Sequence, residues 1–222
     1  MVFFYDPRCK EETLELTDDN FTHLIKARRS KVGDLLDGRN FQDSNLYTYK
    51  IESIQKRKAY LVLDSFKASK SPGKPITLAW CVVDGKTVEK TLPFLNELGV
   101  EKLFFIYSQR SQKNIKLNIH RLEKILINSS CQCGRSTMMT LESFDSLGDF
   151  LKRYPKSSYL NFGGREIVKE SFDEPIIVGP EGGFSKIDLE ELSGKNPLGV
   201  QHSLILRSET AITSLASLGA FL

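Results

Sequence analysis

The strongest chemical signal in the chain is a glycine-rich segment, PIIVGPEGGFSKIDLEEL, at residues 175–192. Its apolar start predicts a strand over 175–178, and three glycines follow within the five residues 179–183. Glycines let backbone amides and carbonyls approach a ligand closely, and loops after strands bind ligands in open α/β sheets. We therefore expect a binding loop, with a plain tight turn as the alternative. Ser185 is expected to cap the following helix, with Asp188 completing the capping pattern.

The glycine pattern narrows the class of ligand. No Gly-Lys-Ser/Thr follows the loop, so it is not the phosphate-binding loop of nucleotide hydrolases. It is not G-x-G-x-x-G either, and it comes late in its domain and not after the first strand. Nucleotide phosphates are therefore disfavoured. A ligand read by backbone polar groups, such as an adenine with an amino-acid tail, fits better.

A second segment, LILRSETAITSLASL at 204–218, carries charged residues between a predicted strand and a predicted helix. Ser208 is expected to be the N-cap, and Glu209 in the first turn suits the helix dipole. Capping alone explains both residues, whereas it does not explain Arg207. An arginine at a strand–helix junction is a good candidate to hold a phosphate or a base.

The charge distribution points to a polyanion. The chain has 31 Lys and Arg against 28 Asp and Glu, a net charge of only +3, yet residues 102–141 hold seven basic residues and one acidic residue, a local +6. Clustered basic side chains attract phosphates, so RNA or DNA binding is favoured over a solvated basic face. Smaller basic clusters occur near the N-terminus, at Lys26, Arg28, Arg29, Lys31, Lys56, Arg57 and Lys58.

The elements that position these segments fall into two parts of different sequence pattern. Between them lies KASKSPGKP, residues 67–75, whose composition is typical of a linker. Short alternating runs before it predict a small β-barrel with strands at 2–5, 46–54 and 59–64 and one helix at 19–29. The alternation of strands and helices after it predicts an α/β domain with parallel strands. Those strands are expected at 76–83, 102–107, 136–140, 157–161, 175–178 and 203–206, and the helices at 86–98, 118–130, 144–153, 186–193 and 209–220.

Composition excludes several classes of protein. Of 222 residues, 40% are hydrophobic and 27% charged, which disfavours a disordered chain, a collagen and a coiled coil. The apolar runs are of strand length, and the first residues lack the apolar core of a signal peptide, so we expect a cytoplasmic protein without a membrane span. Four Cys and three His fit no zinc pattern, which predicts no metal. No nucleophile elbow, Cys/His dyad or paired carboxylates at catalytic spacing are recognisable.

The ordered pair GPEGGFS (179–185) and LRSETA (206–211) resembles the RsmE family, which methylates N3 of a uridine in 16S ribosomal RNA and belongs to the SPOUT superfamily. The similarity covers nearly the whole chain. Two departures remove a basic residue each: Pro93-Phe94 stand where the family usually has Gln-Lys, and residues 201–204 replace Leu-Gly-x-Arg. Further matches are Phe3-Phe4, His23-Leu24, Arg28 or Arg29, Gly33-Asp34, Glu97-Leu98-Gly99-Val100, Arg110-Ser111, Arg121, Gln132 and Arg135.

The resemblance implies an architecture and partners. Residues 1–70 would form a PUA-like β-barrel that binds RNA, and residues 74–222 a SPOUT-type α/β domain with a C-terminal deep trefoil knot. The protein would be a homodimer through the knot domain, and its substrate the 16S rRNA of the 30S subunit. The cofactor would be S-adenosyl-L-methionine. Its binding residues would be Leu160, Asn161, Phe162, Val178, Gly179, Pro180, Glu181, Gly182, Gly183, Leu206, Ser208, Thr210 and Ala211.

The resemblance also suggests catalytic and RNA-binding residues. Arg207 is the first candidate to stabilise the uracil anion, as in an oxyanion hole, and Glu181 and Glu209 would organise the loops or act as bases. The residues expected to contact RNA are Arg8, Arg28, Arg29, Arg110, Lys113, Lys116, Arg121 and Arg135. Two alternatives stay open: another SPOUT methyltransferase acting on transfer RNA or a ribose 2′-hydroxyl, and a non-catalytic RNA-binding or ribosome assembly factor.

Overall fold

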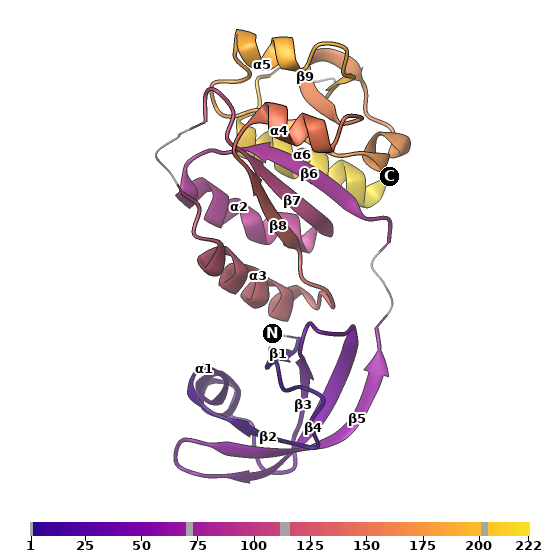
Figure 1. Ribbon diagram of the computed structural model, residues 1–222. Helices are drawn as coiled ribbons and strands as arrows, with labels where there is room; N and C mark the ends of the chain where they lie inside the picture. Colours follow the sequence, from indigo (N-terminus) through magenta and orange to yellow (C-terminus); the bar gives the residue numbers. More distant parts are fainter. Residues whose placement is uncertain (1, 70–72, 112–115, 201–203) are drawn as a thin grey trace. The chain divides into compact units, whose positions relative to one another are not determined.

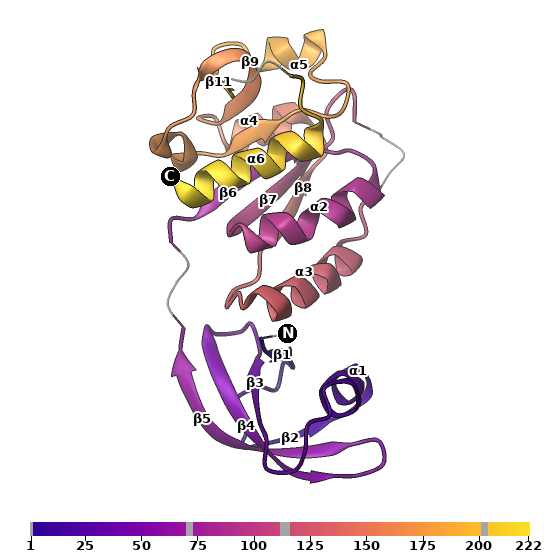
Figure 2. The same cartoon turned by 180° about the vertical axis from the view of Figure 1, so that it is seen from behind.

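The computed structural model describes residues 2–69, 73–111, 116–200 and 204–222. It divides into two compact units (Figures 1 and 2): the first comprises Met1–Ser71 and Ile127–Met138, and the second Pro72–Leu126 and Met139–Leu222. The sequence patterns had not indicated that residues 127–138 pack with the first unit. None of the helices within the described ranges is both long and apolar enough to cross a bilayer.

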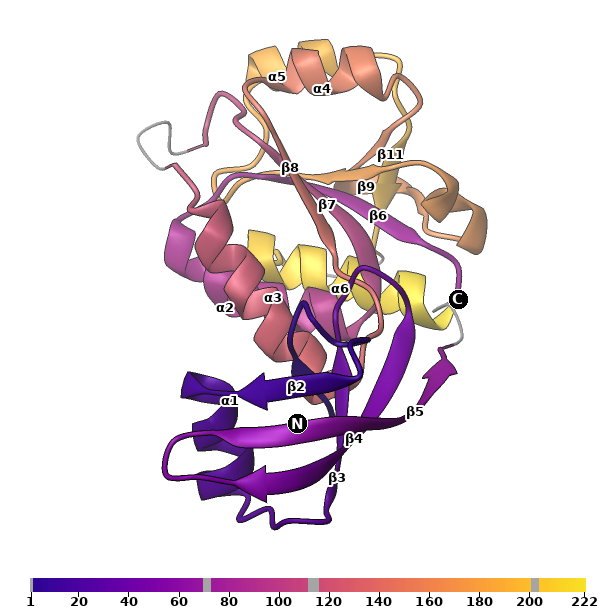
Figure 3. The ribbon, with the colours of Figure 1, turned by 60° about the horizontal axis from the view of Figure 1, so that its bottom comes forward.

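The first unit is built on a five-stranded sheet with the strand order β1-β3-β4-β5-β2. The long strands β4 and β5 pair antiparallel, and β2 pairs with β5, as Figure 3 lets the reader follow. Strand β1 runs parallel to β3. Tyr49, Ile51 and Leu61 fill the core and are fully buried. The strands are β1 (Phe4–Tyr5), β2 (Thr13–Leu16), β3 (Leu35–Arg39), β4 (Asn45–Ile54) and β5 (Ala59–Ala68).

The one helix of this sheet domain starts close to its predicted position but changes type. It begins as α1 (Asp18–Phe21) and continues as a π-helix, η1 (Thr22–Ala27), so it ends two residues earlier than the predicted 29. Its apolar side chains Phe21 and Leu24 are buried in the core. Strands β2 and β3 were not predicted, because each is short and carries charged or glycine residues among its apolar ones.

The second unit is a six-stranded, all-parallel sheet with the order β11-β9-β10-β6-β7-β8. This confirms the predicted α/β class. The strands are β6 (Ile76–Cys81), β7 (Val100–Ile106), β8 (Thr140–Phe144), β9 (Ser158–Glu166), β10 (Ile176–Val178) and β11 (Pro197–Gly199). The helices are α2 (Gly85–Glu97), α4 (Leu147–Arg153), α5 (Lys186–Glu191), α6 (Ser208–Phe221) and a 3₁₀ turn, η2 (Lys169–Asp173). Helix α3 (Ile119–Cys133) begins in this unit, and its residues from Ile127 onward belong to the first.

Helices cover both faces of this sheet (Figures 1 and 2). On one face α6 contacts α2, β6 and β10. On the other face α4 and α5 contact each other and close an apolar cluster that includes Phe104, Phe144 and Phe150. A sheet covered on both faces explains why the central strands β6 and β10 are mostly apolar and buried.

Two strand predictions were wrong. Residue 203 of the predicted strand 203–206 lies outside the described residues, and 204–206 form no strand. Leu204 and Ile205 are exposed instead, and they line a cavity. The sequence alone does not separate these cases, because an apolar run can form either a buried strand or the wall of a cavity. The sixth strand is β11, whose Pro197 is tolerated because β11 lies at the sheet edge. The strand predicted at 136–140 begins only at Thr140, since the preceding residues pack with the first unit.

Candidate active site

A wide bulge in β9 forms the first wall of the candidate site. The pairing of β9 with β11 jumps from Tyr159↔Pro197 to Arg165↔Leu198, so residues 160–164 leave the ladder. The bulge is fixed by close backbone packing at Gly164, where an added Cβ would lie 2.3 Å from the carbonyl carbon of Leu198. No side chain fits there. The bulge carries Leu160, Asn161 and Phe162 into a cavity.

The glycine loop predicted from the sequence forms the second wall, directly after β10. The amide of Gly183 donates to the carbonyl of Pro180 (2.8 Å), and Gly183 has φ +66°, a conformation that favours glycine. The loop runs into α5 through a capping box between Ser185 and Asp188. The predicted cap is thus confirmed.

The third wall is the segment before α6. Together the three segments enclose a cavity of about 290 Å³, close to the lower end of the size range of small-molecule sites. Of the residues expected to hold the cofactor, all but Thr210 line this cavity, and Thr210 lies exposed in the first turn of α6. Sequence reasoning missed four lining residues, whose apolar side chains carry no specific signal: Phe184, Val200, Leu204 and Ile205.

Ser208 links two of these walls to the sheet. Its hydroxyl accepts a hydrogen bond from the indole Nε1 of Trp80 (2.7 Å) and donates one to the carbonyl of Gly179 (2.5 Å). Trp80 is fully buried and Ser208 is 5% exposed. The prediction that Ser208 caps α6 was wrong, because the N-cap is Arg207 and no side chain caps this helix. The serine instead holds the start of the glycine loop against α6.

A second connection holds the far end of the glycine loop. The guanidinium of Arg110 donates from Nη1 to the carbonyl oxygen of Gly182. Asp188, 1% exposed, accepts from the amides of Ser185 (2.8 Å) and Gln109 (3.3 Å). The loop after β7 and the glycine loop are therefore joined by a side-chain contact and by a buried carboxylate.

The three catalytic candidates lie at or beside the cavity. Arg207 occupies the extended N-cap position, with a side chain 85% exposed and its Nη1 4.0 Å from Oε1 of Glu209. Glu181 is exposed and lines the cavity. Oε2 of Glu209 is buried and has no hydrogen-bond partner within the part of the chain that the structure describes. The site thus presents an exposed cation and two carboxylates at or beside the cavity.

Comparison with known proteins identifies the family. Residues 69–219 match the family described as an RNA methyltransferase domain, and residues 16–64 match the RNA methyltransferase PUA domain. The chain is 40% identical to the ribosomal RNA small subunit methyltransferase E of Helicobacter pylori (strain ATCC 700392 / 26695), covering 98% of this chain and 99% of that protein. The chain belongs to the ribosomal RNA small subunit methyltransferase E family. The resemblance found in the sequence is thereby confirmed.

Other relatives agree with this family. The methyltransferase E of Aquifex aeolicus is 29% identical over 98% of both chains. A Legionella pneumophila methyltransferase solved with bound SAM superimposes with a TM-score of 0.81 at 25% identity, covering 99% of this chain and 97% of that one. The Neisseria gonorrhoeae methyltransferase E bound to S-adenosyl methionine gives a TM-score of 0.81 at 21% identity, over 98% and 95%. The PUA-like first unit and α/β second unit are those of this methyltransferase family.

The basic residues that were predicted to contact RNA lie in different environments in this methyltransferase E family member. In the second unit, Arg110, Lys116 and Arg121 are exposed, and Arg121 also pairs with Glu89 through its Nε. Lys113 lies outside the described residues. In the first unit, Arg28 and Arg29 are exposed, whereas Arg135 is buried and its Nε donates to the carbonyl of Thr137 (2.9 Å).

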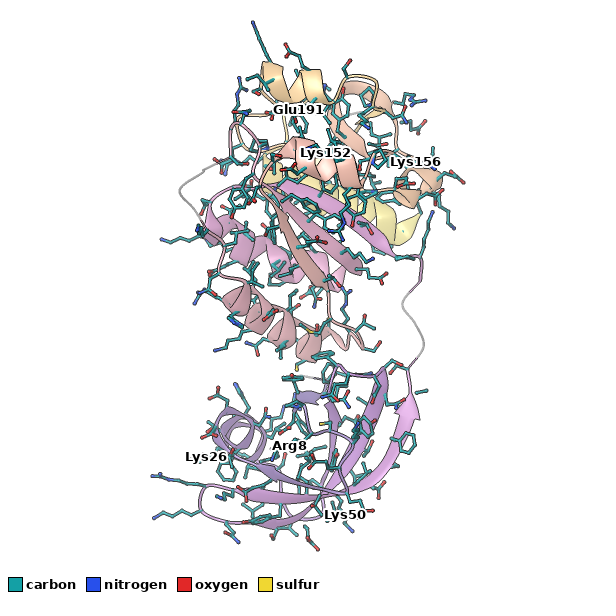
Figure 4. The ribbon with its side chains drawn as sticks, viewed as in Figure 1. Arg8, Lys26, Lys50, Lys152, Lys156 and Glu191 are labelled. Carbon is teal, nitrogen blue, oxygen red and sulfur yellow. The ribbon has the colours of Figure 1, made fainter. Side chains whose placement is uncertain are left out.

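Arg8, labelled in Figure 4, lies in the first unit and pairs with Asp6. Its Nε and Nη2 donate to the two carboxylate oxygens of Asp6 at 3.0 and 2.8 Å, and its side chain stays 47% exposed. Burial raises the pKa of Asp6, but the hydrogen bonds and charge of Arg8 outweigh burial and bring that pKa below its usual value. Nη2 of Arg8 also donates to the carbonyl of Glu15 (3.1 Å).

The three buried cysteines of this family member are poor nucleophiles. Burial, the largest cause, raises the pKa of the Cys9 and Cys81 thiols to about 12 and that of Cys131 to about 11. A thiol must ionise to attack a carbon centre. Cys9, Cys81 and Cys131 therefore pack as small apolar groups, whereas Cys133 is exposed.

Proposed function

We propose that this protein transfers the methyl group of S-adenosylmethionine to N3 of a uridine in the 16S rRNA of the small ribosomal subunit. The observation that carries this is the cavity between the β9 bulge, the glycine loop and the segment before α6, lined by backbone groups and apolar side chains. Relatives of the same family carry the corresponding name, and two solved neighbours contain the cofactor. The protein would act in the cytoplasm, where ribosomal subunits are made.

The residues present fit this cofactor. Its adenine needs apolar cover with a few backbone partners, and the cavity offers Leu160, Val178 and Ile205 beside the backbone of the glycine loop. Its amino-acid end carries a carboxylate, and the amides at the start of α6, a helix of 14 residues, favour an anion. When bound, the cofactor supplies an electrophilic methyl group.

Arg207 is the residue we place against the target base. N3 of uridine must lose its proton before or as it accepts the methyl group, and the resulting negative charge spreads over the two carbonyl oxygens of the ring. A cation aimed at one of those oxygens lowers the barrier, as donors do in an oxyanion hole. The exposed, extended position of Arg207 at the cavity rim suits this role.

The carboxylates have a different role. A carboxylate beside the positive sulfonium would stabilise the ground state, and that stabilisation is lost when the methyl leaves, so it would slow the reaction. Glu181 and Glu209 therefore serve as loop organisers or as the base that takes the N3 proton. Holding donor and acceptor in line supplies much of the remaining rate.

We further propose that the protein is a homodimer through its second unit and that this unit is knotted. Helices α2 and α6 contact each other, and each carries a large exposed aromatic, Phe94 at 55% and Phe221 at 83% exposure. Exposed aromatics on adjoining helices are typical of protein interfaces. The basic residues of both units would then bind the RNA by charge.

The experiment that tests the function uses purified protein, labelled S-adenosylmethionine and 30S subunits from a strain without methylation at this position. Nuclease digestion and mass spectrometry should give 3-methyluridine from 16S rRNA and none from 50S subunits. A 2′-O-methyl nucleoside or labelled transfer RNA would support another SPOUT methyltransferase. Binding to 30S subunits without any methyl transfer or cofactor binding would support an assembly factor.

A further inference from the structure

We infer that Arg110 is a positioning residue for the cofactor, in addition to its predicted contact with RNA. Its guanidinium donates from Nη1 to the carbonyl of Gly182, a residue that lines the cavity. The inference rests on the proposed cofactor site, because it assigns a second role to a basic residue beside that site.

The turn that presents Arg110 is rigidly built. Ser108 and Ser111, 2% and 6% exposed, join their hydroxyls at 3.1 Å, and the amide of Ser111 donates to the carbonyl of Ser108 (3.1 Å). The hydroxyl of Ser111 also donates to the carbonyl of Ile106 at the end of β7 (3.3 Å). The hydrogen bonds of Ser108 and Ser111 thus fix the backbone on both sides of Arg110, although its side chain is exposed.

The glycine loop needs such support at this point. Its start is held by Ser208 at Gly179, and its middle by the turn from Gly183 to Pro180. At Gly182, the stem of Arg110 is the neighbour: an added Cβ would meet its Cδ at 3.5 Å and no other atom within 4 Å. The peptide between Gly182 and Gly183 is thus held at both polar groups, since its N–H donates to Pro180 and its carbonyl accepts from Arg110. Loss of Arg110 would leave only the first of these hydrogen bonds and would loosen backbone groups that the proposed cofactor meets.

Arginine can hold the loop and an RNA phosphate together. Its guanidinium has five N–H donors, and Nη1 uses one of them on Gly182. A phosphate bound at the remaining edge would hold the side chain in place and strengthen its grip on the loop. RNA and cofactor would therefore each raise the affinity for the other, as linkage requires.

The test is calorimetric affinity for S-adenosylmethionine in the absence of RNA. Arg110→Ala should weaken it by roughly three- to tenfold, the effect of losing one hydrogen bond, and should raise KM for the cofactor more than it lowers kcat. Arg110→Lys keeps the charge but not the fork, and should regain RNA affinity while cofactor affinity stays reduced. Lys116→Ala is the matched control: it removes an exposed cation from the same loop and should weaken RNA binding alone.

The outcomes separate the inference from the proposed function. Wild-type affinity for the cofactor in Arg110→Ala, measured without RNA, would overturn the positioning role while leaving the site intact. A wild-type protein that binds no S-adenosylmethionine would overturn the site itself. Thermal melting without ligand should be the same for all variants, because both side chains are exposed.

Discussion

Replacing Ser208 by alanine removes one hydroxyl that two buried or half-buried groups share. Nε1 of Trp80 donates to this oxygen at 2.7 Å, and the hydroxyl donates to the carbonyl of Gly179 at 2.5 Å. Alanine leaves the helix backbone unchanged and adds no volume. The effect therefore reports the two hydrogen bonds and little else.

The cost follows from where the two partners lie. Trp80 is 0% exposed, so its N–H would stay without a partner, at about 1–3 kcal/mol. Gly179 lines the cavity, where water can replace the lost donor, so its share is about 0.5–1 kcal/mol. We expect the free energy of unfolding to fall by about 1.5–4 kcal/mol, the sum of the two shares. For a chain of this size that lowers Tm by about 3–16 °C.

Thermal and urea unfolding of Ser208→Ala, Trp80→Phe and the double variant would measure this effect. Since Trp80→Phe removes the donor, the serine substitution should cost at least about 1 kcal/mol less in that background. Thr213→Val is the control, because its hydroxyl bonds only to the carbonyl of Glu209 in the same helix (2.7 Å); it should change stability by about 0.5 kcal/mol or less. Additive single substitutions, or a Ser208→Ala protein as stable as wild type, would refute the reasoning.

Four other predictions concern the cofactor, the substrate and pH. Gly182→Val should abolish binding of S-adenosylmethionine in calorimetry yet leave melting unchanged, because among the described residues an added Cβ meets the Cδ of Arg110 at an ordinary contact distance of 3.5 Å; retained affinity would place the cofactor elsewhere. Arg207→Ala should bind cofactor normally and lose methylation of 30S subunits, and normal turnover would remove its catalytic role. RNA affinity should fall with salt at a log–log slope of roughly −3 if about four phosphates are neutralised, whereas a flat dependence would make residues 102–141 a solvated face. Asp6 has a lower pKa folded than unfolded, so it stabilises the first unit above about pH 4 and loses that effect as pH falls; Asp6→Asn should flatten the acid limb of Tm against pH, and an unchanged limb would contradict this.

Much of the site could be predicted because its chemistry is local in sequence. The composition of residues 179–183 predicts the glycine loop, and the spacing of Ser185 and Asp188 predicts the capping box. The β9 bulge was harder to predict, because the residues around Asn161 otherwise have the pattern of a strand. The pair Gly163-Gly164 was the one signal in this segment that the pairing breaks. The resemblance, and not periodicity, brought residues 160–162 into the predicted set.

Contacts between distant segments could not be predicted from pattern. Ser208 looked like a helix cap because serine before a helix usually is one, and only the position of Trp80 reveals its other role. In the sequence Arg110 is one basic residue among several. Its hydrogen bond to Gly182 depends on how the loops that follow β7 and β10 meet. Leu204 and Ile205 read as a strand because exposure in a cavity and burial in a sheet both select apolar side chains.

The hydrogen bond from Trp80 to Ser208 also bears on how the protein folds. It joins positions 128 residues apart. Proteins rich in such distant contacts fold slowly, because the entropy of closing a long loop is lost before the contact contributes its stabilising free energy. Helices and hairpins can form earlier without shaping the cavity. The cavity takes its form only when α6 docks beside β6. Affinity for the cofactor therefore marks the completion of folding, and a stalled chain with normal helix content would fail to bind it.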